Sequence, residues 1–212
     1  MSINEIAERS YYQNFDILGA GRGSSNSGEK YKLSELDNYP LKDKSCLDIG
    51  CNAGYFLFRL LDKQPKKLIG VDLGPNFIEI ANELNKEHFK SDRVEFIYGD
   101  IFTCKFDIKF DLIICFSTFH YFIDKQKDFL DLCHSFLNED GILLLEVEEY
   151  PLNDKAILDK TPRPADKIPY DYPNALMMEE FCKDRFNILD RYISTFQGGS
   201  LYDRYFYELE KI

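Results

Sequence analysis

The residues most clearly suited to binding a ligand lie in one short string, CLDIGCNAGYF, which runs from Cys46 to Phe56. In it an apolar run containing Asp48 leads into two glycines four residues apart, Gly50 and Gly54. Glycines at a strand-to-helix bend let a bound molecule approach the backbone closely. In a parallel α/β sheet, ligands bind outside the carboxyl ends of the strands. The string therefore predicts a small-molecule site where the first strand ends.

Two classes of nucleotide cofactor compete for a glycine turn of this kind. A dinucleotide site needs three glycines in the pattern Gly-x-Gly-x-x-Gly, so that the pyrophosphate can lie against the backbone. Counted from Gly50, the second and third glycines would fall at Asn52 and Tyr55, whose side chains block that approach. The sequence of the turn therefore argues against a dinucleotide cofactor. The pattern that remains is Asp-x-Gly-x-x-x-Gly, formed by Asp48, Gly50 and Gly54.

Acidic residues also follow the next two apolar runs. Asp72 ends the run LIGVD, and Asp100 ends the run VEFIYGD. An acid at the end of the second strand is placed to accept hydrogen bonds from ribose hydroxyls, as in nucleotide-binding folds generally. One glycine motif alone is a weak signal, but these downstream acids agree with a ligand that contains a nucleoside.

As a set, these strings resemble the motifs of class I S-adenosylmethionine (SAM) dependent methyltransferases. The usual glycine pattern of that family, Asp/Glu-x-Gly-x-Gly-x-Gly, differs here only at its middle glycine, which is Asn52. The strings FDLIICFS at 110–117 and LNEDGILL at 137–144 resemble later motifs of the family. The resemblance covers about residues 44–148. It implies a Rossmann-like sheet, SAM as the cofactor and S-adenosylhomocysteine (SAH) as the product.

The resemblance also implies roles for individual residues. Asp48 orients the turn or reaches the methionine amino group, and Gly50 and Gly54 let the amino-acid part lie on the backbone. Asp72 takes the ribose, and the turn that begins at Asp100 takes the adenine. The whole expected cofactor site is Asp48, Gly50, Cys51, Asn52, Gly54, Tyr55, Phe56, Asp72, Leu73, Asp100, Ile101 and Phe116. Two alternatives stay open, in which Asp48 merely caps the turn and Asp100 is an ordinary surface acid.

Methyl transfer is an in-line displacement from a sulfonium ion, so a base is needed only when the attacking atom carries a proton. His120 follows the fourth strand, and its ordinary pKa of about 6.5 suits proton abstraction. Glu148 closes the fifth strand and shares a face with Glu146, whereas Glu149 lies on the other face. We expect His120 and Glu148 to be catalytic, without a metal. The alternative is a His120 that only packs on the cofactor.

The acceptor is harder to name. Amino-methylating enzymes of this family that act on nucleic acids carry an Asn/Asp-Pro-Pro-aromatic string after strand four, where this chain has CFST at 115–118. The net charge of −11 also opposes binding to phosphates. We expect a hydroxyl or amine of a phosphorylated or sugar-type metabolite. A weaker local likeness to tRNA wobble-uridine methyltransferase-like proteins leaves an RNA acceptor open, as well as a non-catalytic SAM-binding protein.

Two segments outside the sheet remain to build the acceptor pocket, residues 1–43 as a lid and the proline-rich 150–173 as an excursion over the site. Tyr11 and Tyr12 are expected to close over the donor, unless they only pack the first helix on the sheet. Arg22 and Arg163 are candidates to hold a phosphate, because arginine donates two parallel hydrogen bonds to such groups. The alternative is that both arginines are merely solvated.

The order of the elements predicts the scaffold. Continuous apolar strands are expected at 45–49, 67–71, 94–98, 110–116 and 141–147, and helices at 53–61, 75–86 and 125–137. Such alternation indicates a parallel sheet covered on both faces. The other predicted elements are a helix at 2–15, a loop at 18–30, a helix at 174–183, and a hairpin of 186–196 with 201–209. The fold class is α/β, a Rossmann-like methyltransferase sheet that is mostly parallel with an antiparallel last strand.

Length and composition limit the organisation further. A chain of 212 residues fits one methyltransferase domain, 1–212. It has no run of 18 apolar residues and no apolar segment near its start, so we expect neither a membrane span nor a secretory signal. The six cysteines contain no Cys-x-x-Cys pair and are expected to be reduced thiols in a cytoplasmic protein.

Overall fold

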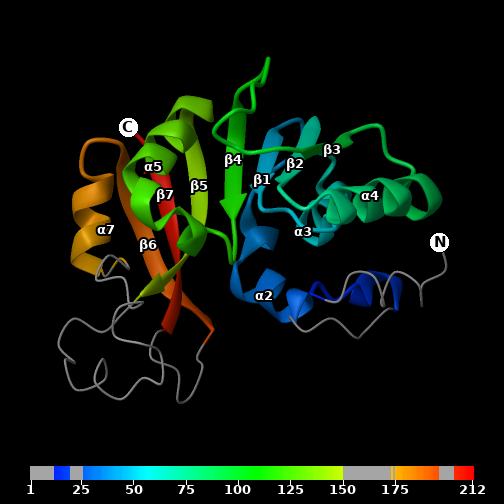
Figure 1. The fold of residues 1–212 in the computed structure, drawn as a ribbon, viewed down its shortest axis with the longest axis horizontal. Coiled ribbons are helices and arrows are strands. Elements are labelled where there is room, and N and C mark those ends of the chain that lie inside the picture. The colour runs from blue at the N-terminus through cyan, green and yellow to red at the C-terminus, as the bar shows by residue number, and fades with distance from the viewer. Residues whose placement is uncertain (1–11, 20–25, 150–172, 174, 196–202) are drawn as a thin grey trace.

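The computed structural model describes residues 12–19, 26–149, 173, 175–195 and 203–212. These residues form a seven-stranded sheet in the order β3-β2-β1-β4-β5-β7-β6 (Figure 1). The strands are β1 (Ser45–Ile49), β2 (Lys67–Asp72), β3 (Val94–Tyr98), β4 (Phe110–Cys115), β5 (Leu137–Glu149), β6 (Phe186–Thr195) and β7 (Asp203–Lys211). Strands β1 to β5 pair in parallel, whereas β7 runs antiparallel to both β5 and β6. The predicted fold class and the antiparallel last strand are confirmed.

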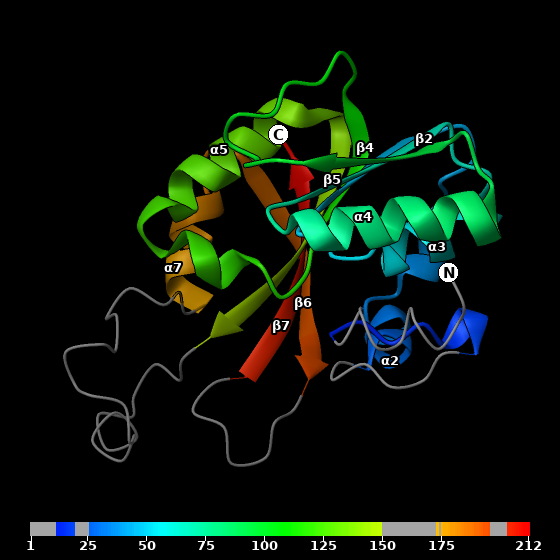
Figure 2. The same ribbon diagram turned by 45° about the vertical axis from the view of Figure 1, so that its right-hand side comes forward.

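Helices cover both faces of this sheet (Figure 2). They are α2 (Ser27–Leu33), α3 (Tyr55–Leu60), α4 (Pro75–Leu84), α5 (Gln126–Phe136) and α7 (Ala175–Cys182). One apolar cluster packs α2, α3 and α4 against the sheet, and a second packs α5 and α7. Successive strand residues alternate between the clusters, as Cys46 and Leu47 do in β1. Burial on both faces explains why these strands are apolar throughout.

The chain changes its direction of winding at β1. From β1 it proceeds outward to β2 and β3, and then returns to β4 on the other side of β1. Asp48 in β1 therefore lies between Gly70 of β2 and Ile114 of β4. Ligands of open α/β sheets bind outside the carboxyl ends of the strands at such a reversal. The topology thus puts the glycine turn at the position where a site was predicted.

The predicted N-terminal helix at 2–15 is wrong where the structure describes it. Residues 12–15 are not helical, and a short 3-10 helix, Asp16–Leu18, follows them. The Phe15 ring packs edge-on against the Tyr55 ring at 5.7 Å, and its side chain is only 1% exposed. Contacts with the sheet domain therefore decide this conformation, and local periodicity does not.

The predicted loop at 18–30 also ends earlier than expected, because α2 begins at Ser27. Asn26 caps this helix by accepting a hydrogen bond from the Glu29 backbone N–H at 3.2 Å. Gly28 contributed to the loop-like composition, but a side chain at this position would overlap the Asp16 carboxylate. The glycine therefore serves close packing between α2 and the N-terminal segment.

The remaining predicted elements differ from the structure mainly at their ends. The helix expected at 53–61 is α3 followed by a 3-10 turn, Leu61–Lys63. Strand β5 starts at Leu137, four residues earlier than predicted, because Leu137 pairs with Phe110 of β4.

Some of the predicted residues and segments lie outside the described residues. They are Tyr11, Arg22, Arg163, residues 150–172 and the connection at 197–200. Among the helices that the structure describes, none combines the length and apolarity needed to cross a membrane.

Candidate functional site

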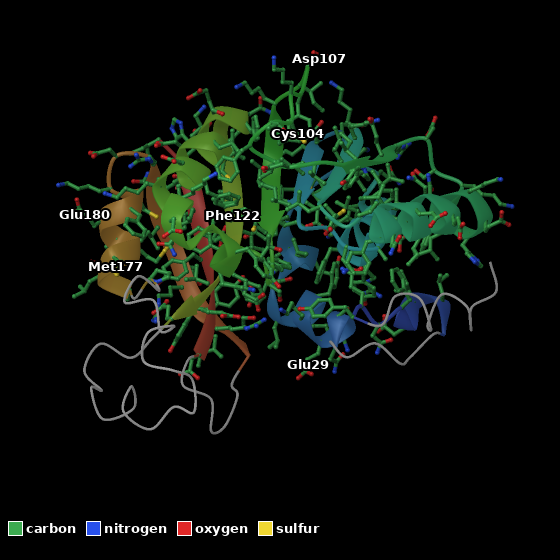
Figure 3. The ribbon with its side chains drawn as sticks, viewed as in Figure 1. Glu29, Cys104, Asp107, Phe122, Met177 and Glu180 are labelled. Atoms are coloured by element: carbon green, nitrogen blue, oxygen red, sulfur yellow. The ribbon has the colours of Figure 1, made fainter. Side chains whose placement is uncertain are left out.

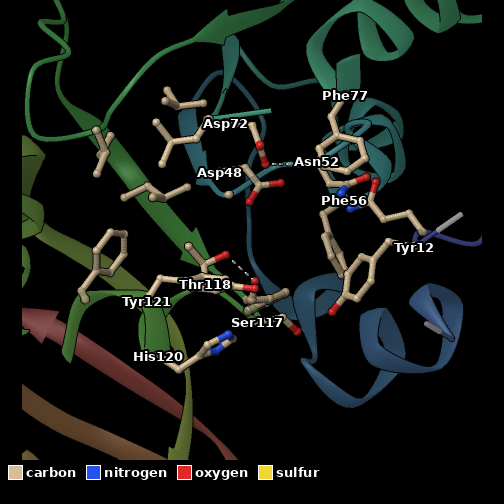
Figure 4. Close-up of a pocket in the computed structure, with 18 of the residues that line it drawn as sticks. Tyr12, Asp48, Asn52, Phe56, Asp72, Phe77, Ser117, Thr118, His120 and Tyr121 are labelled. Carbon is tan, nitrogen blue, oxygen red and sulfur yellow. Dashed lines mark hydrogen bonds between the residues drawn. The ribbon is translucent and has the colours of Figure 1, made fainter. Parts of the chain in front are cut away.

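A cavity of about 560 Å³ lies at the carboxyl ends of β1, β2 and β4 (Figure 4). This volume is within the range of roughly 300–1,000 Å³ that is usual for small-molecule sites. The predicted site residues that line it are Tyr12, Asp48, Gly50, Asn52, Phe56, Asp72, Leu73, Asp100, Ile101, Phe116 and His120. The strand order therefore brings residues of the glycine string together with residues that follow β2, β3 and β4, and Tyr12 joins them from the N-terminal segment.

Gly50 forms the wall of the cavity next to β1. Its φ of 79° is in the left-handed region, and a side chain at this position would overlap Thr118. The backbone N–H groups of Gly50 and Cys51 both donate to the Val71 carbonyl, at 2.8 and 3.1 Å. These bonds fix the turn after β1 to the end of β2, so the glycine leaves bare backbone facing the cavity.

Three predicted cofactor residues, Cys51, Gly54 and Tyr55, do not line the cavity. A side chain at Gly54 would come within 2.5 Å of the Phe96 ring, so this glycine is required by packing under the turn. Cys51 is 1% exposed, and Tyr55 is fully buried. The Tyr55 hydroxyl donates to Asp16 at 2.7 Å, which ties α3 to the N-terminal segment. The prediction placed these three residues at the ligand, whereas in the structure none of the three lines the cavity.

Asp72 organises the turns around it. Its Oδ2 accepts from the Asn52 backbone N–H at 2.8 Å (Figure 4), and its Oδ1 accepts from the Gly74 backbone N–H at 2.7 Å. Each carboxylate oxygen can accept a second hydrogen bond. The side chain is therefore held in place, half-buried at the cavity wall, with acceptor capacity left for ligand hydroxyls.

Asp48 is the most unusual group in the site. It is 2% exposed, and its Oδ2 has no hydrogen-bond partner among the residues that the structure describes. Burial, and secondarily the charge of Asp72, raises the pKa of Asp48 well above its usual value. A buried acceptor oxygen at a cavity wall is suited to a cationic or N–H-bearing ligand group. This orphaned oxygen fits the amino group of a methionine moiety.

Ile101, Leu73 and Phe77 add apolar side chains to the lining of the cavity. Ile101 is 4% exposed and lines the wall, while the Asp100 carboxylate is exposed and accepts from the Phe102 N–H at 3.0 Å. Leu73 is 66% exposed at the rim, and Phe77 of α4 lines the cavity. Phe77 was not predicted as a cavity residue, because an aromatic residue on an amphipathic helix is typical of a core position.

The N-terminal segment closes one side of the cavity through Tyr12 and Gln13 (Figure 4). The Gln13 side chain donates to the Cys51 carbonyl at 3.2 Å and accepts from the Tyr55 backbone N–H at 3.3 Å. It thus binds both ends of the glycine turn and caps the start of α3. Gln13 could not be predicted from the sequence, because a single glutamine in this segment has no pattern that indicates the contact.

His120 lines the cavity beyond β4, but Glu148 does not. The His120 Nδ1 lies 3.6 Å from Glu148 Oε1, which is longer than a hydrogen bond. Burial lowers the pKa of His120, although the charge of Glu148 raises it and the charge of Arg204 lowers it. The imidazole is therefore neutral at pH 7. Of the two residues expected to be catalytic, His120 lines the cavity, whereas Glu148 lies behind His120 and Arg204, so the catalytic role of each stays a prediction.

A polar cluster that sequence analysis did not predict lies beside His120. Ser117 follows β4 with a φ of 51°, and its backbone N–H donates to Glu146 Oε2 at 2.7 Å. Lys30 of α2 donates to the same oxygen at 2.7 Å, and Arg204 of β7 donates to Glu148. These residues lie far apart in the sequence, so no local motif joins them. Lys30, Ser117 and Arg204 therefore give the cavity a cationic and hydroxyl-bearing wall near His120.

The chain matches a family model described as a methyltransferase domain over residues 40–185. A tRNA U34 carboxymethyltransferase of Sulfurovum sp. (strain NBC37-1) is 34% identical over 157 residues, which are 72% of this chain and 50% of that protein. A malonyl-[acyl-carrier protein] O-methyltransferase of Acetivibrio thermocellus is 30% identical over 188 residues, which are 83% of this chain and 65% of that protein. The chain spans about half the length of the tRNA-named relatives it matches.

Solved structures share the fold at low sequence identity. A putative S-adenosylmethionine dependent methyltransferase of Listeria monocytogenes superposes with a TM-score of 0.67 at 15% identity, over 89% of this chain and 100% of that one. The N-methyltransferase NodS of Bradyrhizobium japonicum WM9, solved with SAH, gives 0.65 at 17% identity, over 100% and 99%. The matched range 40–185 includes β1 to β5 and the motif residues that line the cavity. The chain therefore belongs to the methyltransferase domain family and has the fold of its SAM-dependent members.

Proposed function

We propose that the chain transfers a methyl group from SAM to a hydroxyl or amine of a small-molecule acceptor. The observation that carries this proposal is that the motif residues Asp48, Gly50 and Asp72 line the same cavity as the imidazole of His120. Family membership supports the reaction type, and the arrangement within the cavity supports the division into a donor end and an acceptor end.

The donor end has groups suited to each part of SAM. The Asp48 oxygen that has no partner among the described residues would accept from the amino group, and the bare backbone at Gly50 would lie along the amino-acid part. Asp72, which is already fixed by two backbone N–H groups, would accept from the ribose hydroxyls. Ile101 and Phe77 would enclose the adenine. When bound, SAM supplies a methyl group on a sulfonium, which needs no further activation.

His120 is the candidate base at the acceptor end. Because its lowered pKa keeps the ring neutral at pH 7, an imidazole nitrogen can take the proton that leaves the attacking hydroxyl or amine. Glu148, 3.6 Å away, would attract the imidazolium that forms. General-base catalysis of this kind contributes typically ~10²–10⁴-fold in rate. His120→Gln is expected to lower kcat within this range, and unchanged turnover would show that alignment of the reactants is sufficient.

An RNA acceptor is the second candidate, because several relatives are named tRNA U34 carboxymethyltransferases. The charge of −11 opposes this candidate, since phosphate neutralisation supplies most non-specific affinity for nucleic acids. The test is binding of unmodified tRNA between 50 and 200 mM salt. Under the small-molecule proposal no salt-sensitive complex forms, whereas a steep loss of tRNA binding over this range would favour the RNA acceptor.

The proposal is tested by a turnover screen with radiolabelled SAM. The acceptors are sugar nucleotides, phosphorylated metabolites and unmodified tRNA, and the Asp72→Ala variant reports background. We expect label to appear in at least one small molecule and not in tRNA. Label in tRNA alone would replace the small-molecule proposal with the second candidate, and SAH binding without transfer to any acceptor would indicate a non-catalytic SAM-binding protein.

A further inference from the structure

Two cationic side chains, the buried Lys30 and the partly buried Arg204, line the cavity near His120, and the proposed methyl transfer assigns neither of them to a group of the ligand. Lys30 lies on α2 and Arg204 on β7, near opposite ends of the chain. Their side chains are 8% and 17% exposed. Burying charged groups is costly, and apolar residues of similar volume often serve stability equally well. Stability alone therefore does not account for two cations at a cavity wall.

Both cations converge on one hydroxyl group. Lys30 Nζ and Arg204 Nη1 donate to Ser117 Oγ at 2.7 and 3.0 Å, and Ser117 lines the cavity. The carboxylates that balance these charges, Glu146 and Glu148, bind the same two side chains but are not part of the lining. The cavity wall thus presents cationic N–H groups, with the carboxylates behind them.

We infer that Lys30 and Arg204 form an anion subsite, which anchors a carboxylate or phosphate group of the acceptor next to His120. The inference rests on the proposed function and narrows its acceptor class. Two of the three Lys30 N–H groups are used by Ser117 and Glu146, and the third has no partner in the described part of the chain. Charge-assisted hydrogen bonds from lysine and arginine are the usual means of recognising these anions.

The methionine carboxylate of the cofactor is the competing ligand for the same cations. The experiment therefore uses the full chain saturated with SAH, so that any group on the cofactor is already in place. Inorganic phosphate and acetate are titrated separately at pH 7, with chloride holding the ionic strength constant. The imidazole resonances of His120 report binding, because this ring lies beside Glu148 and Arg204. The two titrations distinguish a phosphate-bearing from a carboxylate-bearing acceptor.

The decisive variant is Lys30→Met with Glu146→Gln, which removes the cation together with its buried partner and leaves the net charge unchanged. Loss of one charge-assisted hydrogen bond should weaken binding of the anion by about tenfold or more. Lys32→Met is the matched control, because Lys32 is an exposed lysine on the same helix. A second pair, Arg204→Met with Glu148→Gln, tests the other cation if the first pair does not fold.

The parent and the Lys32→Met control are expected to show a saturable shift of the His120 resonances with at least one anion. In the paired variants the affinity for that anion should be lower. Three results would overturn the subsite: no saturable shift in the SAH complex, equal affinity in the paired variants, or anion binding that appears only without SAH. Failure of SAH itself to bind would contradict the proposed function, whereas SAH binding without anion binding contradicts the subsite alone.

Discussion

Asp48 and Asp72 are near the ends of adjacent strands, but the protein satisfies their carboxylates differently. Both Asp72 oxygens accept backbone N–H groups, from Asn52 and Gly74. The Asp48 Oδ2 is buried with no partner among the described residues, and its pKa is raised well above the usual value, first by burial and then by Asp72. The Asp72 carboxylate is therefore held in position without a ligand. The buried Asp48 oxygen lacks a hydrogen-bond donor among the described residues, and a cationic ligand group would supply one.

This difference predicts that SAH binding releases a proton wherever the pH lies below the raised pKa of Asp48. A ligand ammonium beside Asp48 would lower the pKa that burial raises, so Asp48 gives up its proton on binding and affinity weakens as the pH falls. Calorimetry in buffers of different ionisation enthalpy counts the protons released. In Asp48→Asn the release should vanish and affinity should fall about tenfold. Equal proton release from the variant would assign the effect to another group.

A second prediction at this scale concerns His120, which Glu148 and Arg204 influence in opposite directions. Replacing Glu148 with Gln removes a charge that raises the His120 pKa, so the already lowered pKa should fall further. NMR titration of the imidazole measures this shift without any acceptor, and the resonances of His88 and His134 are internal controls. An unchanged or higher His120 pKa in Glu148→Gln would exclude Glu148 as the group that acts on this ring.

At the scale of elements, the sequence predicted the repeating strands and helices well, because each strand is buried on both faces and each cavity motif follows a strand. It failed at α2 and at residues 12–15, where long-range contacts decide the conformation. Lys30 could not be predicted as a cavity residue for the same reason. Its position depends on α2 starting inside a string that reads as a loop, and on contacts with β4 and β5.

The turn between β1 and α3 gives a prediction about stability. Gly54 has a φ of 85° and lies against Phe96, whereas Gly19 has a φ of 75° with no atom within 4 Å of an added Cβ. Gly19→Ala measures backbone strain alone, which costs about 1 kcal/mol. Gly54→Ala adds a clash and should lower the free energy of unfolding by about 1–3 kcal/mol more. Equal losses in denaturant unfolding would show that Phe96 moves away freely.

At the scale of the whole molecule, the reversal of winding at β1 makes the site predictable, and the ends of the chain complete it. Motif residues at the ends of β1 to β4 could be assigned from their positions alone, since parallel strands share one carboxyl edge. The acceptor end depends on α2 and β7, which the strand order brings together from the start and the end of the chain. Under the proposed function, the residues that recognise the donor can therefore be predicted from local motifs, whereas those that recognise the acceptor depend on long-range contacts in the fold.

The central claim is that this cavity binds the cofactor of methyl transfer, and calorimetry with SAH tests it most directly. We compare the parent, Asp72→Ala and the matched control Asp107→Ala. Asp107 is an exposed acid, and it lies far from Glu29, which marks the position of α2 (Figure 3). Thermal unfolding confirms that each variant is folded. We predict one SAH per chain for the parent and for Asp107→Ala, with binding reduced at least tenfold in Asp72→Ala. No SAH binding by the parent, or equal binding by Asp72→Ala, would contradict the account.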